Sequence, residues 1–74
     1  MAQRMLSFNL RPLSEVAAEF NRYNRIQLSV DPLAAAIPIG GTFQASNVDA
    51  FARLLHDAYS LTTKQEGDTI RISN

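Results

Sequence analysis

Apolar residues recur along the chain with two alternating periods, and each period predicts one type of element. Spacings of three and four residues predict two amphipathic helices. The first carries the stripe Leu13, Val16, Ala17, Phe20 and Tyr23, and the second carries Val48, Phe51, Ala52, Leu55, Ala58 and Tyr59. Short apolar runs and strict alternation predict strands at 5–8, 26–30, 37–43, 61–65 and 69–73. The chain is therefore expected to alternate between strands and helices.

Local signals place the ends of these elements. Pro12 is expected at the first position of the first helix, where no backbone N–H is needed, and Asn24 is expected to end it in a left-handed conformation. Ser46, with Asp49 three residues later, approximates a capping box at the start of the second helix. Residues 33–36 are expected to form a single helical turn. Gly40-Gly41 is expected to mark a bulge or a turn.

A shift of 35 positions superimposes the apolar positions of the two halves. The matched pairs are Phe8 with Phe43, Leu13 with Val48, Val16 with Phe51, Ala17 with Ala52, Phe20 with Leu55, and Ile26 with Leu61. A strand–helix–strand unit over residues 5–30 thus recurs over 39–66, and a closing strand at 69–73 forms a hairpin with the strand before it. Each helix has one apolar stripe that needs a sheet to cover it. The expected fold class is α+β, with two βαβ repeats and a closing strand.

The charge balance narrows the classes of partner. Seven Lys and Arg residues offset seven Asp and Glu residues, so the formal net charge is zero. Nucleic-acid binding normally requires a basic patch that displaces counterions, and we expect no nucleic-acid partner here. The longest apolar stretch, 33–39, contains Pro38 and is far shorter than the ~20 residues that span a bilayer. We therefore expect no direct membrane contact by this chain.

Few residues of the sequence could serve catalysis, metal binding or cofactor binding. The absence of Cys excludes disulfides and thiolate metal sites. His56 is the only side chain that ordinarily titrates near neutral pH, and the repeat matches it to Asn21, a position off the apolar stripe. A catalytic His needs a partner in defined geometry, and a metal needs more ligands than one His supplies. Gly40-Gly41 lacks the spacing of a phosphate-binding loop. We expect no enzymatic activity, no metal and no cofactor.

Several strings resemble a family of regulators. These are Leu6-Ser7-Phe8, Pro12-Leu13-Ser14-Glu15-Val16-Ala17, Glu19-Phe20-Asn21-Arg22-Tyr23-Asn24, Asp31-Pro32-Leu33-Ala34, Ile39-Gly40-Gly41-Thr42-Phe43, Phe51-Ala52-Arg53-Leu54-Leu55 and Gly67-Asp68-Thr69-Ile70. Together they resemble the C-terminal domain of FecR-type anti-sigma regulators over about residues 6–72. The most specific string is the one from Glu19 to Asn24. Residues 1–4 are then an N-terminal extension, and 5–74 form a single signalling-type domain.

This resemblance implies a role in cell-surface signalling. A FecR-type regulator holds a sigma factor with a cytoplasmic segment, crosses the inner membrane once, and ends in a periplasmic region. Its last domain binds the signalling domain of an outer-membrane TonB-dependent transducer, commonly an importer of ferric siderophores. This chain would be the periplasmic sensor fragment, and it would reach the sigma factor only through a cytoplasmic segment that it does not contain.

The same apolar frame is similar to the short N-terminal domain of secretins and TonB-dependent transducers. In that group two βαβ units hold their helices between two small sheets, which the 35-residue repeat also suggests here. Members typically carry a Gly-Thr-Gly-Leu-like string near the end of the second helix, where this chain has residues 56–61, His-Asp-Ala-Tyr-Ser-Leu. That difference favours the regulator, and the transducer or secretin domain stays as the alternative.

Candidate contacts with a partner lie at the end of the first helix and on exposed strand edges. Arg22 and Arg25 lie off the apolar stripe, although Arg22 could instead pair with Glu19 on the helix surface. An exposed strand edge can bind a strand of another protein through backbone hydrogen bonds. The candidate edges are 37–43, where Pro38 partly blunts pairing, and 69–73. The candidate residues on these two edges are Ile37, Ile39, Thr69 and Arg71.

Overall fold

The computed structural model describes residues 4–74 and contains two helices and five strands. Their bounds are β1 Met5–Pro12, α1 Leu13–Tyr23, β2 Gln27–Val30, β3 Pro38–Gln44, α2 Val48–Tyr59, β4 Thr62–Glu66 and β5 Thr69–Ser73. Most of the extension expected at residues 1–4 lies outside the described residues. Arg4, its last member, is held to the fold because its carbonyl accepts a hydrogen bond from the Ala45 N–H at 2.9 Å.

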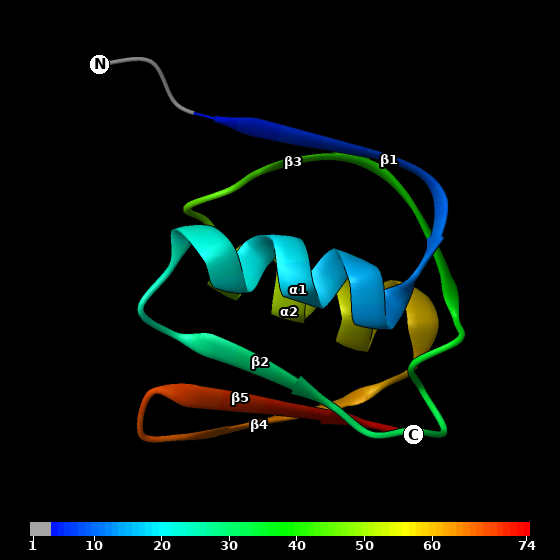
Figure 1. The fold of residues 1–74 in the computed structure, drawn as a ribbon. Coiled ribbons are helices and arrows are strands. Elements are labelled where there is room, and N and C mark those ends of the chain that lie inside the picture. Colours follow the sequence, from blue (N-terminus) through cyan, green and yellow to red (C-terminus); the bar gives the residue numbers. More distant parts are fainter. Residues whose placement is uncertain (1–3) are drawn as a thin grey trace.

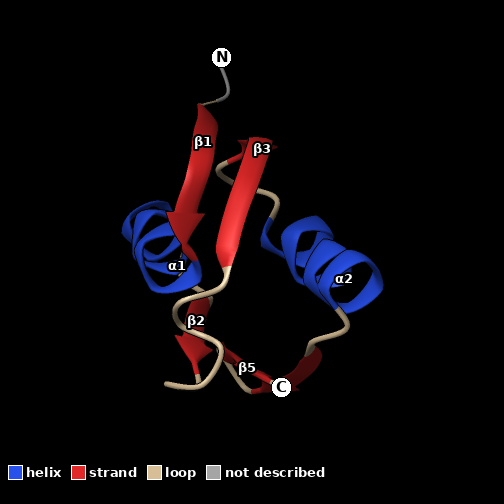
Figure 2. Ribbon diagram, turned by 90° about the vertical axis from the view of Figure 1, so that its right-hand side faces the viewer, coloured by secondary structure: helices blue, strands red, loops and turns tan. Residues whose placement is uncertain are grey.

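The strands form two separate sheets, one on each side of the helical layer (Figure 1). β1 and β3 pair antiparallel in the first sheet. In the second sheet β5 lies between β2, to which it is parallel, and β4, to which it is antiparallel. Figure 2 shows α1 and α2 side by side between the two sheets. The expected α+β class, with two helices between two small sheets, is confirmed.

The repeat found in the sequence corresponds to β1–α1–β2 and β3–α2–β4. The two strands of each unit do not share a sheet, because each unit sends its first strand to one sheet and its second strand to the other. The two units therefore interlock, and neither could cover its own helix alone. The closing strand β5 pairs with the second strand of both units and joins them.

The core lies between the sheets and is dominated by the apolar helix stripes. Phe20 and Phe51, one from each helix, are buried and stack with their ring centroids 4.5 Å apart. Phe43 of β3 meets the Phe51 ring edge-on at 5.1 Å. Stacked and edge-to-face pairs at such distances add to the stability that area burial supplies. The stripes are shorter than expected at their ends, since Tyr23 is 39% exposed and Ala58 is also exposed.

Both expected helix starts are wrong. Pro12 is the N-cap residue of α1, with φ −56° and ψ 141°, so it ends β1 and precedes the first helical position. The cap of α2 is Asn47 and not Ser46, because the Asn47 side chain accepts a hydrogen bond from the Ala50 N–H at 3.3 Å. A side-chain oxygen in this position satisfies one of the N–H groups that a helix leaves free at its start.

Asn24 is also not left-handed, as its φ of −131° and ψ of 148° are extended. Its side-chain amide instead donates to the carbonyls of Phe20 and Ala45, which satisfies the end of α1 and ties it to the chain after β3. The left-handed position is taken at the end of α2 by Ser60, with φ 57°. The helical turn expected at residues 33–36 is replaced by consecutive turns over 32–36, in which the Ala34 N–H donates to the Asp31 carbonyl at 2.8 Å.

The glycine pair lies inside β3 and faces an irregularity in β1. Gly41 has φ 126°, a backbone conformation that side-chain-bearing residues rarely adopt. The register changes from Phe8–Gly41 to Arg11–Ile39, so the extra residue of the bulge is in β1, where Leu10 has φ 53°. The expected bulge therefore exists, and the strand opposite the glycines carries the inserted residue.

Candidate interaction surfaces

Strand edges are the main candidate surfaces, because the two short sheets leave four outer edges on β1, β2, β3 and β4. β5 has no free edge, since β2 and β4 pair with it on both sides. The expectation that 69–73 offers an edge is therefore wrong. Thr69 is half-buried within this sheet. Arg71 points to the outer face, because the alternate residues Ile70 and Ile72 are buried, and it forms an ion pair with Glu66 at 3.5 Å.

Ile37 and Ile39, expected on the edge at 37–43, both make contacts within the fold. Ile39 is 0% exposed, so its side chain belongs to the core and cannot meet a partner. Ile37 is half-buried; its carbonyl accepts from the Leu13 N–H at 2.9 Å and its N–H donates to the Ala34 carbonyl at 3.2 Å. Of the four candidates on the expected edges, only Arg71 presents an exposed side chain. Its strand β5 belongs to the sheet on the other side of the helical layer from β3, the strand that contains Ile39 (Figure 1).

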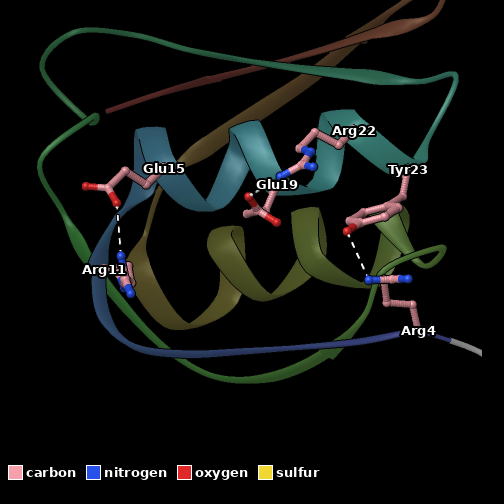
Figure 3. Close-up of polar contacts among 6 residues, drawn as sticks. All are labelled: Arg4, Arg11, Glu15, Glu19, Arg22 and Tyr23. Carbon is pink, nitrogen blue, oxygen red and sulfur yellow. Dashed lines mark hydrogen bonds and ion pairs between the residues drawn. The ribbon is translucent and has the colours of Figure 1, made fainter.

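The two arginines at the end of α1 are exposed. Arg22 forms the expected ion pair with Glu19, at 3.2 Å, and its guanidinium lies 6.0 Å from the centre of the Tyr23 ring. Arg4 approaches the same tyrosine, donates to its hydroxyl at 3.2 Å and lies 4.9 Å from the ring centre (Figure 3). Arg25 lines a shallow hollow between the end of α1 and the start of α2. Exposed pairs of this kind contribute about 0–1 kcal/mol each, so these side chains are available to a partner at little cost.

The middle of the outer edge of β2 is capped by a single side chain. The Asn21 amide nitrogen donates to the Leu28 carbonyl at 3.1 Å, and the Asn21 amide oxygen accepts from the Leu28 N–H at 2.7 Å. These are the backbone groups that face away from β5, because the flanking N–H groups of Gln27 and Asp31 donate toward it. The side-chain amide therefore takes the place of a neighbouring strand. Asn21 was not among the expected site residues, and the family string that contains it gives no sign of this role.

The outer edge of β3 is blocked at both ends of the strand. Pro38 has no N–H to donate, and the Gln44 carbonyl accepts from the Asn47 N–H at 3.0 Å. Gly40 and Gly41 lie opposite the bulge, where the ladder is irregular. Between these features only the backbone of Thr42 remains in regular strand geometry and faces outward.

The outer edge of β4 is open but entirely polar. Its two-residue turn makes Glu66 and Thr69 a hydrogen-bonded pair, so the backbone groups of Thr63 and Gln65 face outward. The whole strand is Thr-Thr-Lys-Gln-Glu, and Lys64 is exposed. A lysine on a short polar edge is a common device against unwanted strand pairing.

The outer edge of β1 is open and borders an apolar-floored groove. Because the Ala45 N–H donates to the Arg4 carbonyl, the alternation of the ladder turns the backbone of Leu6 and Phe8 toward β3 and that of Met5 and Ser7 outward. A groove of about 420 Å³ runs between this edge and α1. It is lined by Met5, Leu6, Ser7, Phe8, Arg11, Glu15, Ala18 and Glu19, none of them from β3.

Within residues 4–74 no group of three or more metal-ligating side chains comes together, and no helix is long and apolar enough to cross a membrane. His56 is exposed, and its Nδ1 lies 3.1 Å from the Leu61 carbonyl, one residue before β4. It occupies the position equivalent to Asn21 in the other unit, and both side chains tie the end of a helix to the strand that follows it.

The sequence matches no family model and no curated protein. Among solved structures, two crystal structures of a candidate anti-sigma factor from Parabacteroides distasonis ATCC 8503 share the fold, with TM-scores of 0.81 and 0.79 and 20% sequence identity in each case. Each similarity covers 97% of this chain. The chain spans about a third of the length of those proteins, 34% of each. At this identity the similarity establishes the fold, and it places the same fold within larger chains.

Proposed function

We propose that this chain is the protein-interaction module of a transmembrane anti-sigma regulator. In this proposal it lies in the periplasm and binds the signalling domain of an outer-membrane TonB-dependent transducer. The observation that carries the proposal is the match of nearly the whole chain to one third of a candidate anti-sigma factor. The FecR-type strings over residues 6–72 support the same assignment from the sequence.

The module would act by binding alone. Control of the sigma factor would pass through a membrane-spanning segment and a cytoplasmic segment of the parent protein. The exposed side chains of Arg22 and Arg25 and the open edges of β1 and β4 are surfaces that such a module can offer. We propose that His56 has no catalytic role, and a screen for hydrolase activity in which His56→Ala and the wild type behave alike would agree with this.

The direct test is calorimetric titration of the chain with the isolated signalling domain of its cognate transducer. Association that saturates at one partner per chain supports the proposal. Absence of association at high micromolar concentration, with both proteins folded by NMR, would contradict it. The transducer signalling domain of an unrelated system is the matched control for specificity.

The alternative is that this chain is itself the N-terminal domain of a TonB-dependent transducer or of a secretin. The two small sheets around a helical layer, expected for that group, favour it. The parent reading frame separates the two candidates. A single membrane helix before the domain indicates the regulator, and a barrel or secretin channel after it indicates the alternative.

A further inference from the structure

We propose that the open edge of β1 accepts an extended segment of a partner protein, which adds a third strand beside Met5–Phe8 and sets a basic side chain against Glu15 and Glu19. The proposed function supplies only the identity of the protein that contributes this strand. The assignment of the edge itself rests on the backbone and on the groove beside it.

Backbone geometry distinguishes the edge of β1 from those of β2 and β3. β1 has β3 on one side only, and the outward N–H and C=O groups of Met5 and Ser7 form no hydrogen bond with another element in residues 4–74. At β2 the outward groups of Leu28 are bound by Asn21. At β3 the ends of the edge are blocked by a proline and by an internal hydrogen bond. An added strand gains affinity from just such free main-chain groups.

The groove gives β1 what the equally open β4 lacks, a surface for the side chains of the added strand. Met5 is 52% exposed, and Phe8 is half-buried at the groove. Ala18 of α1 is exposed and too small to fill the space between helix and strand. Alternate side chains of an added strand would enter this groove, where apolar contact with Phe8 and Ala18 removes surface from water.

The charges along the groove favour a cation on that strand. Glu15 and Glu19 lie one helical turn apart on its α1 wall, and Arg11 is the only cationic side chain among the lining residues. Glu15 contacts Arg11 at 3.3 Å and Glu19 contacts Arg22 at 3.2 Å (Figure 3). The two glutamates remain 57% and 38% exposed. A carboxylate has about four acceptor sites, so each can accept a further donor from a Lys or Arg.

The length of the acceptor edge is limited by the bulge. Regular pairing ends after Phe8, and Leu10 has φ 53° in the inserted segment. The added strand is therefore short, and selectivity depends on its basic residue and on its apolar neighbours. This matches a regulatory contact that forms and dissociates.

The test uses the whole chain and a synthetic peptide of alternating Val and Thr with one central Lys. Titration to about 1 mM peptide is followed by NMR, together with amide hydrogen exchange. We expect the amides of Met5 and Ser7 to become protected and those of Thr63 and Gln65 on β4 to stay unprotected. A peptide with central Glu in place of Lys should bind several-fold more weakly, and the difference should shrink at high salt.

Ser7→Pro removes one outward donor at the β1 edge and is expected to weaken peptide binding about tenfold. Thr63→Pro is the matched control on β4 and should leave the affinity unchanged. If Ser7→Pro fails to fold, Ala18→Lys fills the groove with a competing cation at an exposed helix position, and Ala58→Lys on α2 is its control. Ala18→Lys should weaken peptide binding, and Ala58→Lys should not.

Three results would overturn the assignment. The first is that the amides of Met5 and Ser7 gain no protection at about 1 mM peptide, and the second is equal protection at the β4 edge. The third is a dimer of this chain that disappears in Ser7→Pro, because a second copy would then be the occupant of the edge. The proposed function is judged separately. If the peptide binds at β1 and the transducer domain does not bind, the edge stands and that function falls. If the transducer domain binds while Met5 and Ser7 stay unprotected, the edge assignment falls.

Discussion

Replacing Asn21 by Ala removes the side chain that caps the middle of the outer edge of β2. The Asn21 amide makes two hydrogen bonds to the backbone of Leu28, at 3.1 Å and 2.7 Å, and both are partly buried. The substitution leaves the Leu28 N–H and C=O with only the water that can reach them. We therefore expect a loss of stability that is specific to this edge.

The magnitude follows from the two bonds and from the helix. Each hydrogen bond contributes about 1 kcal/mol net, so the loss of both costs about 2 kcal/mol. Ala is a better helix former than Asn by about 0.5 kcal/mol, which opposes the loss. The net change is about 1.5 kcal/mol, or a fall in Tm of roughly 6–12 °C for a domain of this size. The variant should stay folded, because a domain of 74 residues is expected to have a stability of roughly 4 kcal/mol or more.

Urea unfolding followed by far-UV circular dichroism measures this change, with an m-value equal to that of the wild type. Amide hydrogen exchange gives a local readout, since the Leu28 amide should exchange faster in Asn21→Ala. Ser14→Ala, an exposed change on the same helix, is the control and should be neutral or slightly stabilising. A stability within about 0.5 kcal/mol of the wild type, with unchanged exchange at Leu28, would refute the reasoning.

Three further predictions test the core, the glycine in β3 and the surface. Phe51→Ala removes the ring stacked on Phe20 and should cost about 3–5 kcal/mol, enough to unfold much of the protein, as shown by loss of NMR dispersion. Gly41→Ala should lower stability by about 1–3 kcal/mol because of its φ of 126°, whereas Gly40→Ala, whose nearest contact is at 3.7 Å, should be close to neutral in the same urea assay. Arg22→Ala should change stability by less than about 1 kcal/mol, so any fall in its affinity for a partner would report a direct contact.

The helices and the doubled unit were predictable because they depend on periodic burial. The shift that matches Phe20 with Leu55 selects residues that the structure buries at 0% exposure, and periodicity reports burial directly. The ends of the helices and strands could be predicted less well from the sequence. Ser46 and Asn47 are both good cap residues, and only the path of the chain from β3 selects Asn47.

Strand partners could not be read from the chain, because pairing depends on contacts between residues distant in sequence. The pattern Ile70–Ile72 identifies β5 as half-buried, and the hairpin explains its pairing with β4. Nothing local shows that β5 also pairs with β2, where Leu28 lies opposite Ile70. For this reason the expected edge at 69–73 was wrong, and the open edge of β1 was missed. The strand expected at 5–8 coincides with the regular part of β1, but its outward groups follow only from the register with β3.

The two units protect the outer edges of their second strands, β2 and β4, to different degrees. This difference bears on which edges can bind a strand of another protein. In the first unit Asn21 binds both outward groups of Leu28, in the middle of β2. In the second unit the equivalent His56 reaches only the carbonyl of Leu61, before β4 begins, and a ring nitrogen that donates there cannot also bind the N–H groups of the strand. The β4 edge therefore depends on its polar side chains and Lys64 for protection. The regular part of β1, Met5–Phe8, has neither a capping side-chain amide nor a lysine, so it stays open to an added strand up to the bulge that ends it.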